Sequence, residues 1–123
     1  MFRTFLLIGI GGMIGSILRY SVYLLMLRGS IFPLPWGTFA VNVTGSFLIG
    51  LIIGWTDKAG IGSQEWRLFL ATGLCGGFTT FSALSLESVN MLKAGNLSWA
   101  FLYITGSVLF GIGATFLGLM FSR

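Results

Sequence analysis

Long apolar stretches alternate with short polar segments along this chain of 123 residues. Four such stretches cover about residues 4–27, 37–55, 67–92 and 97–121. Each of them meets the length of roughly 20 residues that an α-helix needs to cross the hydrocarbon core of a bilayer. The pattern therefore predicts an all-α, multi-pass membrane protein, with one four-helix transmembrane domain over residues 1–123.

The polar segments between the stretches are predicted to be loops, at about residues 28–36, 56–66 and 93–96. Gly95 is suited to end a helix, because glycine adopts the left-handed conformation of a C-cap. Tryptophans accompany the predicted span ends, as expected of side chains that anchor at the membrane interface: Trp36, Trp55, Trp66 and Trp99. The first stretch has about 22 apolar residues, too many for a signal peptide core, so we expect a retained span.

Composition supports the membrane prediction and excludes several classes of function. Hydrophobic residues make up 55% of the chain and charged residues 8%, against about 25% charged in a typical soluble domain. The chain has no histidine and one cysteine, Cys75, so it offers no histidine base and no cysteine pair. We therefore expect no enzyme. The net charge of +4 is typical of basic residues that flank spans and not of a nucleic-acid-binding surface.

Basic residues are divided almost evenly between the two predicted ends of the bundle. The end with both termini carries Arg3, Lys58, Arg67 and Arg123, and the other end carries Arg28 and Lys93, with Arg19 nearby. Under the positive-inside rule, so small a difference in Lys and Arg between the two ends favours neither orientation of the chain in the membrane. Insertion in both orientations, followed by antiparallel dimerisation, is one hypothesis for such a chain. An oligomer is also expected because four short helices enclose little interior once their side chains pack.

Polar side chains in the second span follow one helical stripe. Asn42, Gly45 and Ile49 are spaced three and four residues apart, and Ser46 lies beside them. An asparagine in lipid is costly unless its amide is paired. The stripe therefore predicts either a polar contact that holds two helices together or an amide that lines a pore.

The third span contains a run of glycines and hydroxyls, GLCGGFTTFS at residues 73–82, in mid-membrane. Helix propensity in this run is poor. We expect the helix to break near residues 76–80 and to free carbonyl groups, which membranes tolerate only inside protein or beside a polar cavity or ion. The interpretations are a cation site built from carbonyls or a simple packing kink.

Glu87 and Arg19 are two charged residues that lie inside the predicted spans rather than at their first or last position. An acid in a membrane is a functional candidate by default, but Glu87 also has Lys93 nearby at the membrane surface. Arg19 is expected either to snorkel to the interface or to give an anion vestibule a positive potential. On the fourth span, Tyr103 and Ser107 share one helix face because they are four residues apart.

Three motifs resemble the Fluc (CrcB) fluoride channels: GMIGSILRY at residues 12–20, GTFAVNVTGSF at 37–47 and GLCGGFTTFS at 73–82. The resemblance covers three of the four spans in order and agrees with the chain length. It implies a fluoride channel in a prokaryotic cell membrane, through which fluoride leaves passively so that its toxicity in the cytoplasm falls. It also implies an antiparallel, dual-topology homodimer with two pores, and a structural Na⁺ on the dimer axis held by the carbonyls of Gly76 and Thr79.

The resemblance also assigns the fluoride pore residues, which are Asn42, Phe81, Ser82, Tyr103 and Ser107, with Glu87 at the pore and Arg19 in the vestibule. Amide and hydroxyl donors, among them that of Thr80, would replace the water of the ion. The ring edge of Phe81 carries partial positive charge and would be a weak ligand. The family usually has a second phenylalanine where this chain has Leu84, and Phe78 or Phe47 is a candidate substitute.

Two other classes remain as alternatives. A small dual-topology exporter that couples drug or cation transport to protons depends on an acid in its first span, where this chain has Arg19 and no acid. A non-conducting structural subunit would explain the glycines but not the clustered polar groups. Proton dependence of transport would distinguish the exporter from a channel.

Overall fold

The computed structural model describes residues 1–27, 34–60 and 63–122 and contains no strand among them. Arg28 and Arg123, which enter the charge balance above, lie outside these ranges. Four helical stretches are long and apolar enough to cross a membrane: Phe2–Met26, Trp36–Ala59, Ser63–Lys93 and Leu97–Phe121. The predicted all-α class with four membrane spans is thereby confirmed.

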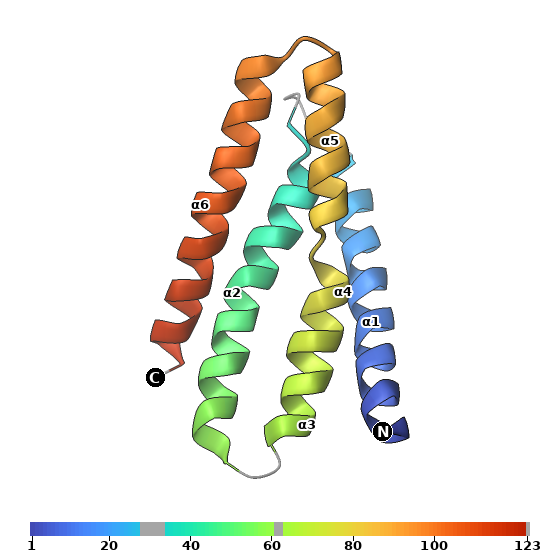
Figure 1. Ribbon diagram of the computed structural model, residues 1–123, viewed down its shortest axis with the longest axis vertical. Helices are drawn as coiled ribbons and strands as arrows, with labels where there is room; N and C mark the ends of the chain where they lie inside the picture. Colours follow the sequence, from blue (N-terminus) through green and yellow to red (C-terminus); the bar gives the residue numbers. More distant parts are fainter. Residues whose placement is uncertain (28–33, 61–62, 123) are drawn as a thin grey trace.

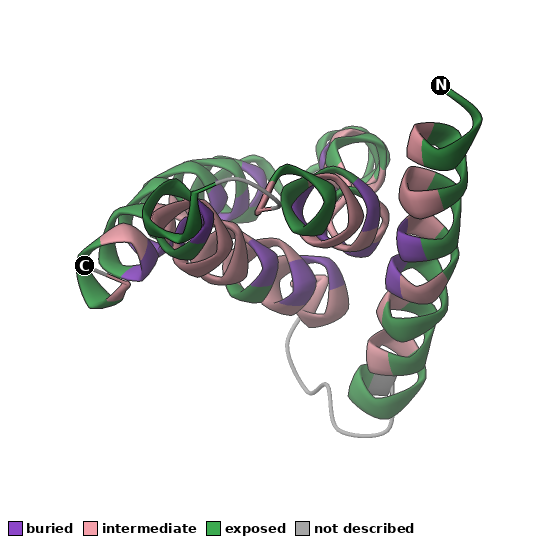
Figure 2. Cartoon of the chain, turned by 90° about the horizontal axis from the view of Figure 1, so that it is seen from below, coloured by how far each residue is buried: buried purple, intermediate pink, exposed green. Residues whose placement is uncertain are grey.

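Helices α1 (Phe2–Leu27), α2 (Trp36–Ala59) and α6 (Leu97–Phe121) are continuous, whereas the third span consists of several pieces. These pieces are α3 (Ser63–Arg67), the π-helix η1 (Leu68–Cys75), α4 (Gly76–Phe78) and α5 (Phe81–Lys93). In Figure 1, α1 and α6 lie at opposite edges, and α2 and the third span lie between them. Buried positions face inward and exposed positions face outward in Figure 2, as expected of helices whose outer faces meet lipid.

Glycines allow the backbones to approach closely on both sides of the bundle. A Cβ atom on Gly15 would collide with the backbone of Leu74 and Phe78, and one on Gly77 would collide with the backbone of Gly12. On the other side, a Cβ atom on Gly118 would meet the backbone of α2. Small residues at such contacts are typical of membrane helix packing, where van der Waals contact drives association. α1 is thereby fixed against η1 and α4.

The third span breaks at Thr79 and Thr80, within the predicted window of residues 76–80. Thr79 (φ −89°, ψ 159°) and Thr80 (φ −152°, ψ 119°) have extended backbones. Gly76 and Gly77 remain helical as part of α4. The π-helix just before the break was not predicted, although π segments are frequent near functional sites.

The predicted loop at residues 56–66 is wrong for most of its length. α2 continues to Ala59, and α3 begins at Ser63. The Thr56 hydroxyl donates to the Ile53 carbonyl, and Arg67 Nη1 lies 3.1 Å from Asp57 Oδ1. The polar side chains that indicated a loop therefore belong to the end of α2 and the start of α3.

The turn between the last two spans follows its prediction. Gly95 has a φ of +83°, the left-handed conformation that favours glycine. The N–H of Asn96 donates to the Met91 carbonyl and that of Gly95 to the Leu92 carbonyl. These two bonds satisfy carbonyls at the end of α5 and place α6 antiparallel to it.

Candidate functional site

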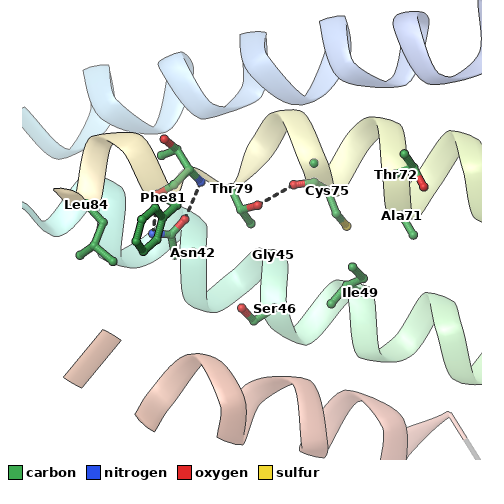
Figure 3. A pocket seen from close by; sticks show the side chains of 12 residues that line it. Asn42, Gly45, Ser46, Ile49, Ala71, Thr72, Cys75, Thr79, Phe81 and Leu84 are labelled. Atoms are coloured by element: carbon green, nitrogen blue, oxygen red, sulfur yellow. Dashed lines mark hydrogen bonds between the residues drawn. The ribbon is translucent and has the colours of Figure 1, made fainter. Parts of the chain in front are cut away.

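A cavity of about 380 Å³ lies between α2 and the third span at the break. The α2 stripe predicted from the sequence faces it with all four of its members, Asn42, Gly45, Ser46 and Ile49. The other wall comes from η1, α4, the break and α5, with Ala71, Thr72, Cys75, Gly76, Thr79, Thr80, Phe81 and Leu84. Figure 3 shows these side chains around the interrupted helix. The cavity is therefore the place where most of the predicted site residues meet.

Asn42 pairs with the backbone of Thr80 through both ends of its amide (the Asn42–Thr80 pair, Figure 3). Its Nδ2 donates to the Thr80 carbonyl at 3.1 Å, and its Oδ1 accepts the Thr80 N–H at 2.8 Å. A break inside a bilayer leaves backbone groups that water cannot satisfy, and this amide replaces two of the missing partners. The second N–H of Nδ2 remains for another acceptor.

Hydroxyl groups complete the polar lining of the break. Thr80 Oγ1 accepts the N–H of Ala83 at 3.1 Å and so caps the start of α5. The same oxygen lies 3.2 Å from Ser82 Oγ, which is exposed. Thr79 Oγ1 donates to the Cys75 carbonyl at 2.9 Å. The hydroxyls of Thr80 and Ser82 thus lie together at the start of α5, and Thr80 also lines the cavity.

Phe81 and Leu84 both line the cavity, one turn apart on α5. The Phe81 side chain is 79% exposed in the single chain, so its ring edge is free to meet an ion or another protein surface. Neither proposed substitute for a second aromatic residue lies along this cavity. Phe78 is buried at 8% exposure, and Phe47 packs edge-on against Phe121. Leu84 therefore occupies that position without an aromatic replacement.

The carbonyls predicted to hold Na⁺ belong to residues that line the same cavity, Gly76 and Thr79. The N–H of Thr80 points to Asn42, so the Gly76 carbonyl loses the donor that a continuous helix would supply. No cluster of three acidic, histidine or cysteine side chains that could hold a metal is present in the described part of the chain. Carbonyl oxygens suit a hard cation, so the residues at the break fit the predicted group.

Arg19 reaches the break from the α1 side. Its Nε donates to the Gly77 carbonyl at 3.0 Å, and its side chain is half-buried. The sequence left snorkelling and a vestibule charge open for this residue. Its Nε is directed at the carboxyl end of α4, where a cation is favoured by the helix dipole. The vestibule role of its charge stays a prediction.

Glu87 lies away from the break in a network that joins four helices. Its Oε2 accepts from Thr38 at 2.7 Å and its Oε1 from Tyr103 at 2.8 Å. Tyr23 OH lies 2.9 Å from the Thr38 hydroxyl. Thr38 and Tyr103 are 1% and 3% exposed, so the carboxylate has buried donors on both oxygens. Sequence reasoning missed Thr38, although it lies one turn before Asn42 on the same stripe.

Ser107 lies apart from both groups. It lines a second, open cavity of about 570 Å³ that runs along α6, with Thr115 in its lining and Ser46 contributed by α2. Its buried Oγ has no hydrogen-bond partner within the described ranges. Ser46 borders both cavities. The predicted pore residues therefore fall into three neighbouring groups, at the break, around Glu87 and on α6.

Comparisons with known proteins agree on one family. The family model described as "CrcB-like protein, Camphor Resistance (CrcB)" matches residues 6–119. A protein of Hyphomonas neptunium named a fluoride-specific ion channel is 52% identical over 97% of this chain and 94% of its own length. Proteins of the same name from Phocaeicola vulgatus and Flavobacterium psychrophilum are 46% and 41% identical, each over 98% of this chain and 99% and 98% of their own lengths.

Proposed function

The chain belongs to the CrcB-like family, and on this premise we propose that it is a fluoride-specific channel through which fluoride leaves the cell passively. The observation that supports this best is similarity over nearly the whole length to fluoride-specific channels. Export in this way lowers the concentration of toxic fluoride in the cytoplasm. Four membrane spans place the protein in the cell membrane as a multi-pass protein.

Fluoride enters a pore only if the pore replaces its tightly held water. The cavity at the break offers uncharged donors for this, the second N–H of Asn42 and the hydroxyl of Thr80. The exposed Ser82 hydroxyl lies beside that of Thr80 and would add another donor. The ring edge of Phe81 adds a weak positive contact. Weak ligands favour conduction because a strong ligand would trap the ion. Among the residues that the structure describes, no carboxylate lines this cavity to repel an anion.

Tyr103, Ser107 and Glu87 extend the proposed path beyond the break. Ser46 adjoins the cavity that contains Ser107. The Ser107 hydroxyl has no partner among the described residues, so its O–H would be available to fluoride. Tyr103 donates to Glu87, so it would reach fluoride only by exchanging partners. Leu84 lines the path in place of a second ring, and Arg19 supplies positive potential from the α1 side.

The structural Na⁺ is a second part of the proposal. The carbonyls of Gly76 and Thr79 would hold it, since both residues line the cavity. When bound, the ion supplies positive potential to the anion path and neutralises carbonyls freed by the break. The Asn42–Thr80 pair supports the extended backbone at Thr79 and Thr80, and it takes the Thr80 N–H away from the Gly76 carbonyl.

The working unit is proposed to be an antiparallel homodimer. One chain leaves the cavity open toward its surface, with Phe81 79% exposed in a membrane protein. A second copy would close this side and complete the pores. Insertion in both orientations fits the weak charge bias of the sequence.

An introduced cysteine tests the dual topology. Ala94 is exposed in the turn between α5 and α6, whereas the native Cys75 is buried. A membrane-impermeant maleimide applied to intact cells should label about half of an Ala94→Cys protein, and the rest only after the membrane is opened. Labelling of all or none of it from outside would contradict dual topology.

The channel function is tested with purified protein in liposomes loaded with fluoride. A fluoride electrode should record release driven by the fluoride gradient alone, and an imposed proton gradient should not be required. Release that depends on the proton gradient would instead support the exporter class. Absence of release in both conditions would overturn the transport function.

A further inference from the structure

Close packing of α1 against η1 and α4 places Arg19 beside the helix break. Gly15 lies one turn before Arg19 on α1, and its Cα faces the backbone of Leu74 and Phe78 too closely for any Cβ. This contact leaves little freedom in the position of α1 against α4. A residue one turn further along α1 is thereby held beside the end of α4.

The carboxyl end of α4 lacks hydrogen-bond donors. In a continuous helix, the Gly76 and Gly77 carbonyls would accept from the backbone N–H groups four residues later. The N–H of Thr80 is bonded to Asn42, and the chain is extended at Thr79 and Thr80. Arg19 Nε supplies a donor to Gly77 at 3.0 Å.

The residues at the break that matter here lie on two sides, one toward α1 and one toward α2. Gly77 is bonded from α1 by Arg19. Gly76 and Thr79 line the cavity on the α2 side, which Gly77 does not line. Removal of the Arg19 donor would take this hydrogen bond from the Gly77 carbonyl, and α4 would rotate or fray to satisfy it.

We propose that Arg19 is a positioning residue, which holds the end of α4 so that the Gly76 and Thr79 carbonyls are presented together to a monovalent cation. This inference rests on the Na⁺ site in the proposed function. It adds Arg19 as the residue that positions the carbonyls of that site. It assigns Arg19 a role through its hydrogen bond, distinct from attraction of fluoride by its charge.

The sign of a mutational effect separates a hydrogen-bonding role from a purely electrostatic one. A guanidinium near a cation site repels the cation, so a role through charge alone predicts tighter cation binding when Arg19 is neutralised. A positioning role predicts weaker binding when the donor is lost. Arg19→Met removes both donor and charge and keeps an apolar stem, whereas Arg19→Gln removes the charge and keeps an N–H donor.

The experiment measures cation binding without using fluoride flux. Thermal unfolding of the purified protein in detergent is followed as NaCl replaces choline chloride at constant ionic strength. The Na⁺ concentration that gives half of the stabilisation reports the apparent affinity. Arg3→Met is the matched control, because Arg3 lies on the same helix and pairs with Glu65 at the exposed end, away from the break.

Arg19→Met should raise the half-stabilising Na⁺ concentration by about fivefold, the factor expected for one lost hydrogen bond. Arg19→Gln and Arg3→Met should stay within about twofold of the wild type. An unchanged or lower value for Arg19→Met would overturn the positioning role. If Arg19→Met does not fold, a change of about fivefold in either direction for Arg19→Gln would overturn it.

The wild-type titration separates this inference from the function on which it rests. Stabilisation of the wild type by Na⁺ together with a normal Arg19→Met titration would reject the Arg19 role alone. A wild type that does not respond to Na⁺ would reject both the cation site and the inference. Fluoride release from liposomes, measured separately, would still decide the channel function.

Discussion

The third and fourth spans both carry glycines and hydroxyl side chains in mid-membrane, yet only the third is interrupted. α6 runs for 25 residues with Gly106, Gly111, Gly113 and Gly118 inside it. The third span breaks at Thr79 and Thr80 after a π-helix. Glycines and hydroxyl side chains alone are therefore not enough to interrupt a span, and the contacts with neighbouring helices decide where it opens.

The partners of the two spans differ in the groups they offer. On α6, the Thr115 hydroxyl donates to the carbonyls of Ser46 and Gly111, and the helix backbone keeps its own bonds. At the break, Asn42 offers both a donor and an acceptor to the backbone of Thr80. A helix in lipid opens where a neighbour replaces its backbone bonds, because an unpaired group there costs several kcal/mol.

Asn42→Asp should have the largest effect, because it changes the side chain that pairs with the backbone of the interrupted third span. The carboxylate still accepts the Thr80 N–H but no longer donates to the Thr80 carbonyl, and its charge repels fluoride. At an effective dielectric constant of about 20, that repulsion amounts to several kcal/mol near 4 Å, so fluoride efflux should fall by at least about tenfold. Asn90→Asp, at an exposed position on α5, should conduct normally. Normal efflux from Asn42→Asp would remove Asn42 from the pathway.

Gly15→Ala tests whether the third span is fixed by close backbone contact. Its Cβ would meet the backbone of Leu74 and Phe78, and such overpacking should destabilise the protein by about 1–3 kcal/mol. Thermal unfolding in detergent measures the loss. Gly113→Ala on α6 is the matched change, because a Cβ there meets nothing within 4 Å. Equal stability of the two variants would show that α1 does not depend on this contact.

Phe81→Ile addresses the ring edge at the break. Loss of an aromatic contact of about 1 kcal/mol should lower fluoride efflux by roughly fivefold without unfolding the protein. Phe101→Ile is the control, since Phe101 is exposed on α6 and does not line the cavity at the break. If both variants conduct alike, Phe81 serves packing and not conduction.

The smallest expected effects come from paired threonines on the two spans. Thr80→Val removes the oxygen that caps α5 through the Ala83 N–H and should cost about 1 kcal/mol of stability. Thr115→Val leaves the α6 backbone bonds intact and should stay within about 0.5 kcal/mol. Chemical or thermal unfolding compares the two. A larger loss for Thr115→Val would mean that α6 also depends on its side-chain bonds.

The sequence predicted the continuous helices better than the contacts between them. Residues 97–121 were predicted as a span and α6 has these bounds, because the Gly95 turn and an unbroken apolar run determine both ends. Polar residues near Asp57 were misread as a loop, since ion pairs such as that of Asp57 with Arg67 form only when two helix ends meet. Such long-range pairs leave no periodic pattern.

The break was predicted to within five residues, but its position and partners were not. Poor helix propensity identifies the region, whereas the choice of Thr79 and Thr80 depends on Asn42 from another helix. The same limit applies to Glu87, whose donors Thr38 and Tyr103 come from two other spans. The fluoride roles of these residues remain predictions.

The central claim is that uncharged donors at one helix break conduct fluoride selectively. It is tested most directly by fluoride and chloride release from liposomes that contain the purified wild-type protein, each ion recorded with its own electrode. The account predicts fluoride release well above that of protein-free liposomes and no chloride release above that background. Equal release of both ions, or release of neither, would contradict it.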